Sequence, residues 1–132
     1  MNYPERQLIQ GLITAIDSVL PGRAFYTMPP KDAAYPYIYA HDFYWEENGS
    51  KKQFIWSCEF LLEVVHKNLS SKDELLTDTE AILSLIKNSD DITVSGYNVI
   101  ETNLVNTNDI QQLEDSYRLD IELIRLKIEI NE

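Results

Sequence analysis

Apolar residues near the N-terminus recur at the spacing of one helix face. They stand three and four positions apart at Leu8, Ile9, Leu12, Ile13, Ile16, Val19 and Leu20. This pattern predicts an amphipathic helix from Pro4 to Leu20, ended by Pro21 and Gly22. Gly11 lies inside it and weakens it by about 1 kcal/mol relative to alanine. We therefore expect the helix to depend on packing against a sheet.

A two-residue alternation follows the helix. A short apolar strand from Arg23 to Met28 ends at a double proline, which forces extended or turning backbone. Beyond it, aromatic side chains occupy alternate positions at Tyr35, Tyr37, Tyr39, His41, Phe43 and Trp45. Because Pro36 has no N–H to donate, it belongs at the first residue of this second strand or on a sheet edge. We interpret the row of rings as one broad packing side of the strand, not as a ligand site.

Asn48 and Gly49 predict a hairpin, because both residues tolerate positive φ. The third strand runs to about His66. Its even positions form a continuous apolar row, made of Phe54, Trp56, Cys58, Phe60, Leu62 and Val64. This row predicts the side of the hairpin that faces the core.

A second helix is predicted after residue 70. Ser71 and Glu74 have the spacing of a capping box, in which each side chain satisfies a free backbone donor. One face of this helix carries Leu75, Leu76, Thr79, Ile82, Leu83 and Ile86. The polar segment from Asn88 to Asp91 ends the helix.

The last part of the chain predicts a strand pair, Tyr97 to Val105 and Tyr117 to Ile130. The polar linker 106–116 is long for a hairpin, so we expect a mobile or partner-binding loop there. The last strand changes phase between two apolar sets, Leu119, Ile121 and Leu123, then Ile124, Leu126, Ile128 and Ile130. A bulge, a switch in the face that is buried, or cover from a neighbouring subunit would each explain the change.

The order of elements predicts one α+β domain over residues 1–132. Hairpins favour an antiparallel or mixed sheet of about four to five strands, with two helices packed on one face. A length of 132 residues suits a single domain with its own core.

Composition indicates a folded, soluble protein, with 44% hydrophobic and 25% charged residues. The chain lacks a membrane-spanning apolar run and a secretory signal, and its single cysteine, Cys58, fits a reducing compartment. The net charge is −11, of which residues 59–132 carry −10, from six basic and sixteen acidic side chains. Such a surface disfavours nucleic-acid binding.

Chemical motifs are few. Phosphate-binding glycine loops, nucleophile elbows and paired metal-ligand motifs are absent from the sequence. The candidate metal ligands are His41, Asp42, Glu59, Glu63 and His66. Glu59 and Glu63 would stand about 13 Å apart on a strand, which is too far to share one ion. We expect Cys58 to be buried and inert, and we predict no catalytic residue, cofactor or metal. Protein interaction remains as the expected role.

Two stretches carry a resemblance to a known family. The N-terminal helix followed by "RAFYTMPPKDAAYPYIYAHD", and the C-terminal "EDSYRLDIELIRLKIEI", resemble the tail-completion or tail-terminator proteins of long-tailed bacteriophages. The resemblance implies a structural virion protein of the tail or neck, assembled in the host cytoplasm. Such proteins form a ring, typically of six subunits, that caps the tail tube protein and docks the head connector or stopper. DNA would pass through the lumen without sequence-specific binding, and neither a membrane nor catalysis would be involved.

We expect two protein-interface regions in this interpretation. The hairpin tip offers Trp45, Glu46, Glu47, Lys51 and Lys52, and the end of the last strand offers Ile124, Leu126, Ile128 and Ile130. The alternative is that both regions belong to the chain's own hairpin and core. A rival function is an acidic inhibitor or immunity-type protein that binds a basic partner, since high negative charge would steer that association.

Overall fold

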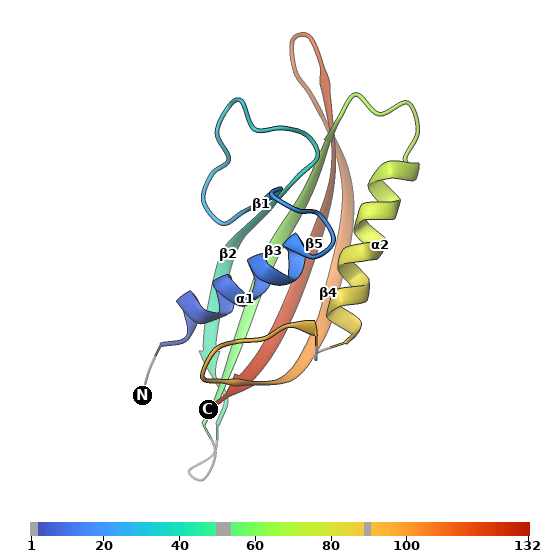
Figure 1. Ribbon diagram of the computed structural model, residues 1–132. Helices are drawn as coiled ribbons and strands as arrows, with labels where there is room; N and C mark the ends of the chain where they lie inside the picture. The colour runs from blue at the N-terminus through green and yellow to red at the C-terminus, as the bar shows by residue number, and fades with distance from the viewer. Residues whose placement is uncertain (1–2, 50–53, 89–90) are drawn as a thin grey trace.

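The computed structural model describes residues 3–49, 54–88 and 91–132. The helices and strands follow one another along the chain in the order shown in Figure 1. They are α1 (Glu5–Asp17), β1 (Ala24–Phe25), β2 (Tyr37–Glu47), β3 (Ile55–Lys67), α2 (Asp73–Lys87), β4 (Asn98–Leu113) and β5 (Arg118–Asn131).

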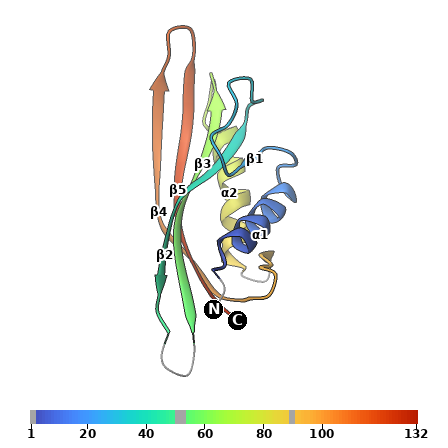
Figure 2. The ribbon, with the colours of Figure 1, turned by 90° about the vertical axis from the view of Figure 1, so that its left-hand side faces the viewer.

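The described strands form one five-stranded sheet in the order β1-β2-β3-β5-β4. β1 pairs with β2 in parallel, and the remaining neighbours are antiparallel. Both helices lie on the same face of the sheet, as Figure 2 shows in side view. The predicted α+β class, with a mixed sheet and two helices on one face, is confirmed. No helix of the described residues covers the opposite face, and we call it the outer face.

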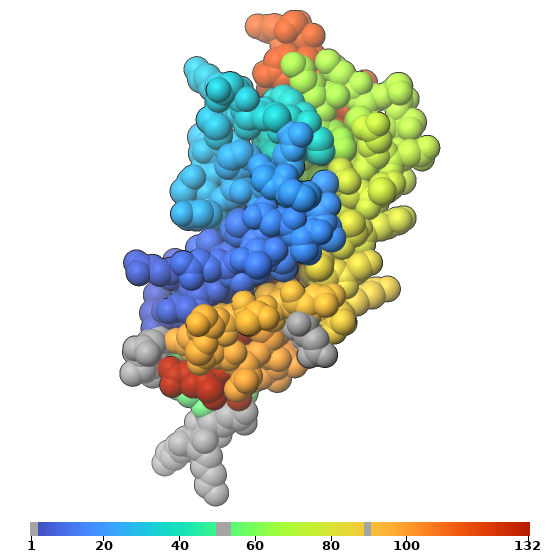
Figure 3. Space-filling model, in the orientation of Figure 1, coloured from blue at the N-terminus to red at the C-terminus, as the bar shows by residue number. Residues whose placement is uncertain are grey.

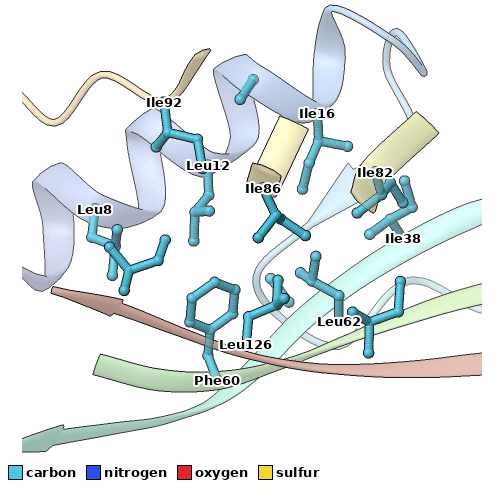
Figure 4. Packing of buried hydrophobic residues seen from close by; sticks show 14 of the residues in the cluster. Leu8, Leu12, Ile16, Ile38, Phe60, Leu62, Ile82, Ile86, Ile92 and Leu126 are labelled. Atoms are coloured by element: carbon cyan, nitrogen blue, oxygen red, sulfur yellow. The ribbon is translucent and has the colours of Figure 1, made fainter. Parts of the chain in front are cut away.

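The main core lies between the helices and the central strands β3 and β5. Phe60 and Leu62 of β3 point toward α1 and α2, as the even-numbered apolar row predicts. Leu8, Leu12 and Ile16 of α1 meet them from above in Figure 4. Burial of these side chains supplies the main driving force for folding, at about 25 cal/mol per Å² of apolar surface.

The phase change in the last strand has a simple origin. β5 pairs with β3 without any register shift, so no bulge intervenes there. Its second half buries Ile124, Leu126, Ile128 and Ile130 under the helices. Its first half turns Leu119 and Ile121 to the outer face, where they pack with Val65, Tyr35 and Tyr37. The strand therefore switches the face that it buries, which was one of the three explanations considered.

A bulge does occur in β2, where it divides the predicted row of rings. The pairing with β3 shifts between His41 and Tyr44, and Asp42 adopts a positive φ of 61°. Before the bulge, Tyr37 and Tyr39 pair with Val65 and Glu63 on the outer face. After it, Trp45 lies opposite Cys58 on the helix-covered face. The expectation of one common packing side for all the rings is therefore wrong.

The predicted loop 106–116 is also wrong over most of its length. β4 continues to Leu113, which pairs with Arg118, so the connection is a short turn. β4 is an edge strand with most of its side chains open to solvent. Polar residues on an open edge strand resemble a loop in sequence, because neither face demands apolar side chains.

The start of α2 differs in detail from the capping box. Lys72 is the N-cap residue, and the Ser71 hydroxyl accepts a hydrogen bond of 3.3 Å from the Asp73 N–H. Glu74 therefore does not close a reciprocal pair with Ser71. The predicted apolar face is largely correct, since Leu75, Thr79, Ile82 and Ile86 are buried, whereas Leu76 is exposed.

Gly11 is a point of close approach between α1 and the segment before β4. A β-carbon there would lie closer than 3.0 Å to the main-chain carbonyl oxygen of Thr93. We expect Gly11→Ala to lower the free energy of unfolding by about 1 to 2 kcal/mol. Overpacking costs about 1 to 3 kcal/mol, and because the atom met is main chain the cost falls in the upper part, about 2 to 3 kcal/mol. After the helix-propensity gain of about 1 kcal/mol, a net loss of about 1 to 2 kcal/mol remains.

Chemical denaturation of both proteins measures this difference. Gln10→Ala is the matched control, because Gln10 is exposed on the same helix. We expect it to change stability by no more than about 0.5 kcal/mol. An alanine at position 11 that leaves the protein equally or more stable would contradict the packing of α1 on Thr93.

Candidate interaction surfaces

Trp45 belongs to an aromatic cluster beside the N-terminus. Its indole N–H donates to Glu5 Oε1 at 3.0 Å, and its ring meets Tyr3 and Trp56 edge-on at centroid distances of 5.6 and 5.9 Å. Such aromatic contacts add about 0.5 to 1.5 kcal/mol beyond the area they bury. Trp45, predicted as an interface residue, therefore anchors the start of α1 to the β2–β3 hairpin.

The other residues of the predicted hairpin tip have different positions. Glu46 and Glu47 are exposed at the end of β2, and Glu46 Oε1 accepts a hydrogen bond of 3.0 Å from the Tyr44 hydroxyl. Lys51 and Lys52 lie outside the described residues. Within the described part, the tip offers carboxylates to a partner.

The aliphatic residues of β5 are not a surface. Ile124, Leu126, Ile128 and Ile130 are each no more than 1% exposed. Helices of the same chain cover them, so they cannot contact a neighbouring subunit in this fold. The alternative interpretation, that they belong to the chain's own core, is the correct one.

The outer face brings together several of the candidate metal ligands, but as ion pairs. His41 Nε2 lies 2.5 Å from Glu63 Oε2, and the His41 ring stacks on Tyr39. Arg125 Nη1 lies 3.7 Å from Glu59 Oε2 and 3.8 Å from Asp42 Oδ2. In residues 3–49, 54–88 and 91–132, no group of three or more His, Cys, Asp or Glu side chains could hold a metal ion.

Cys58 lies on the helix-covered face of β3 and is fully buried. Burial, with a smaller contribution from the nearby Glu5 carboxylate, raises the pKa of its thiol far above the ordinary value. A thiol with such a pKa stays protonated and is a poor nucleophile at neutral pH.

A buried polar cluster lies beside the start of α2. Asp120 is only 6% exposed and faces the helices from β5. Its carboxylate accepts hydrogen bonds from Arg118 Nε at 3.1 Å, the Leu69 N–H at 3.1 Å and Gln111 Nε2 at 3.4 Å. Burial alone would raise the pKa of Asp120, but these hydrogen bonds together hold it below its usual value.

Neighbouring groups complete this cluster. His66 Nε2 lies 2.8 Å from Asp78 Oδ2 of α2, and Lys72 pairs with Asp109 of β4. Burial, together with the negative charge of Asp109, raises the pKa of the Glu122 carboxyl. The cluster fastens the connection between β3 and α2 onto β5. One feature of the sequence indicated this cluster. Asp120 and Glu122 occupy even positions of β5, on the same face as the buried Ile124.

Exposed apolar side chains gather at two other places. One is a groove of about 720 Å³ along α1, lined by Tyr3, Ile9, Ile13 and Tyr26 together with polar residues that include Arg6. We call it the α1 groove. The second is a set on the edge strand β4, where Ile100, Leu104 and Val105 are 42%, 47% and 44% exposed. Sequence reasoning missed both surfaces. The groove residues on α1 have the pattern of an ordinary amphipathic helix, and the polar stretch after Val105 resembles a loop.

Comparison with known proteins is informative at the level of the fold. No model of a known protein family matches the sequence. The curated proteins also contain no match. The fold has a clear structural counterpart. Over 100% of both chains, this protein is similar to a chain of a solved structure described as the virion of a native gene transfer agent particle, with a TM-score of 0.76.

Sequence identity to that chain is 10%. The similarity therefore shows that the two chains share a fold across their whole length. None of the described helices is long and apolar enough to cross a membrane.

Proposed function

We propose that this protein is a structural component of a phage or phage-like virion. In this role it caps the finished tail tube as an oligomeric ring and presents the surface to which the head connector docks. The observation that carries the proposal is the whole-length similarity to a chain of the gene transfer agent virion. The resemblance of the "YPYIYAHD" and C-terminal segments to tail-terminator proteins supports a role at the end of the tail.

The shape of the molecule suits such a position. The long strands run between two ends, with the β4–β5 turn at one end and the end of β2 at the other (Figure 1). A subunit between a tube and a connector needs two separate contact surfaces, one toward each partner. The exposed carboxylates of Glu46 and Glu47 lie at one end, and Glu114 and Asp115 lie in the turn at the other.

The charge of the chain is compatible with a DNA channel. A net charge of −11 disfavours adhesion to phosphates, so DNA could pass through a ring of such subunits without being retained. The same charge also favours the second candidate, an acidic inhibitor that binds a basic protein. The two functions differ in assembly, because an inhibitor of this size should act as a monomer or dimer.

The decisive experiment adds the purified chain to tail tubes isolated from a lysate in which its gene is inactivated. We expect light scattering to detect a ring, and negative-stain images to show that ring at one end of each tube. A basic protein such as lysozyme, added in excess, serves as the test for non-specific charge binding. A chain that stays monomeric at high concentration and ignores the tubes would falsify the proposed function.

A further inference from the structure

The two exposed apolar sets lie at opposite edges of the sheet. β4 forms one edge, whereas β1 and β2 form the other. The α1 groove opens on the β1 side, since Tyr26 directly follows β1. Figure 3 shows α1 in dark blue and the segment after β1 in lighter blue, with orange atoms of the segment that leads into β4 directly against α1, where Gly11 approaches Thr93. Each copy thus carries two different apolar surfaces, at different edges of the sheet.

The apolar residues of β4 coincide with irregularities in its pairing. The register with β5 shifts between Val99 and Glu101 and again between Leu104 and Asn106. Ile100 and Val105 are therefore the extra residues of two bulges, without a partner on β5. Bulges release a side chain from the strict alternation of a strand and often aim it at a binding partner. With the exposed Leu104 beside Val105, these two β-branched residues make the β4 edge a candidate contact surface.

The α1 groove matches this edge in size and charge. A groove of about 720 Å³ has room for several aliphatic side chains, and Tyr3 and Tyr26 at its rim are each 57% exposed. Tyrosine is favoured in interfaces because one end of its side chain is apolar and the other polar. Arg6 and Glu5 both line the groove, and the Glu5 carboxylate already accepts the Trp45 indole N–H. Glu101 lies beside Ile100, and within the described ranges neither Arg6 nor Glu101 has an ion-pair partner.

We propose that the occupant of the α1 groove is a second copy of this chain, which inserts the β4 edge at Ile100, Leu104 and Val105. The contact is head-to-tail, because it joins two different surfaces at opposite edges. Repetition of a head-to-tail contact produces a closed ring when the rotation between copies divides a full turn. The inference rests on the proposed ring and names the surfaces that close it.

Two one-sided variants test this contact. Tyr26→Glu places a charge in the groove and leaves the edge intact, whereas Val105→Glu does the reverse. At concentrations where the wild type assembles, we expect each variant alone to be monomeric, with association weakened at least about tenfold. An equimolar mixture should form dimers and nothing larger, because only one intact groove and one intact edge can meet. Light scattering after size exclusion measures all three samples.

Leu113→Glu is the matched control, because Leu113 is 81% exposed at the far end of β4, eight residues along the chain from Val105. We expect it to assemble as the wild type does. Assembly of either one-sided variant like the wild type, or a mixture that stays monomeric, would overturn the inference. Assembly of Tyr26→Glu with loss in Val105→Glu alone would indicate an edge-to-edge contact and would overturn it as well.

Cysteine cross-linking keeps the test independent of how well the charged variants fold. Tyr26→Cys and Val105→Cys, each in a separate protein, should give a disulfide-linked heterodimer on mild oxidation of the mixture. Predominant homodimers of Val105→Cys would contradict the head-to-tail contact. Rings that form through these surfaces but ignore tail tubes would overturn the proposed function and leave the contact standing. If both charged variants still formed rings on tail tubes, the proposed contact would be overturned and the proposed function would stand.

Discussion

Leu126→Ala is expected to lower the free energy of unfolding by about 3 to 4 kcal/mol, within the range for a leucine removed from a well-packed core. Leu126 is 1% exposed, pairs with Phe60 across the sheet and faces α1 and α2 in Figure 4. Its loss leaves a cavity that neither helix can close without moving. Denaturant titration followed by tryptophan fluorescence measures the change.

Lys127→Ala serves as the matched control, because Lys127 is the next residue of β5 and lies on the outer face. We expect a change of no more than about 0.5 kcal/mol. Measuring both stability and assembly of Leu126→Ala also distinguishes a core residue from a subunit contact. If Leu126→Ala kept its stability but lost the ability to assemble, β5 would be a subunit contact and its place in the core of this chain would be wrong.

Asp120→Asn is expected to cost about 2 to 3 kcal/mol at pH 7, because it removes a charged acceptor of several hydrogen bonds. Arg118 would then lose its carboxylate partner, and the Leu69 N–H would lose a charged acceptor. The affected elements are the β3–α2 connection and the start of β5. We expect local opening at the start of α2 to appear as faster amide exchange around Leu69.

The cost of Asp120→Asn should depend on pH in a defined direction. The pKa of Asp120 is lowered in the folded state, so its contribution to stability is complete above the unfolded value of about 3.9. That contribution disappears as the pH falls through the folded pKa. The difference in unfolding free energy between the wild type and Asp120→Asn should therefore be constant from pH 7 to about 5 and shrink below about 4.

Urea titrations at several pH values measure this profile. Asp115→Asn is the control, since Asp115 is exposed in the β4–β5 turn and should show little effect at any pH. A difference for Asp120→Asn that persists unchanged at pH 3 would mean that the carboxylate charge does not matter. The side chain would then act only through its shape.

The periodic parts of the sequence were sufficient to predict the layers of this fold. Leu8, Leu12 and Ile16 mark the buried stripe of α1, and Phe60 and Leu62 belong to the core row of β3. These patterns are reliable because each reports a single condition, burial of one face of a regular element. The class of the fold follows from their order along the chain.

Residues of β4 and the rings of β2 show where this reasoning ends. An open edge strand needs no apolar face, so the polar stretch after Val105 resembled a loop. In β2, one extra residue between His41 and Tyr44, where Asp42 has a positive φ, reverses the alternation for the rest of the strand. Local composition does not show whether a strand lies at a sheet edge or whether it contains a bulge.

The sequence by itself determined both helices, most of the strand segments, the apolar faces of the regular elements and the acidity of the chain. Only the tertiary structure decided that Ile124 to Ile130 are covered by the chain's own helices, that Gly11 is needed beside Thr93, and that Asp120 is held by Arg118. The physical reason is that periodicity is a property of neighbours along the chain. Burial, close approach and pairing depend on residues that only the fold brings together.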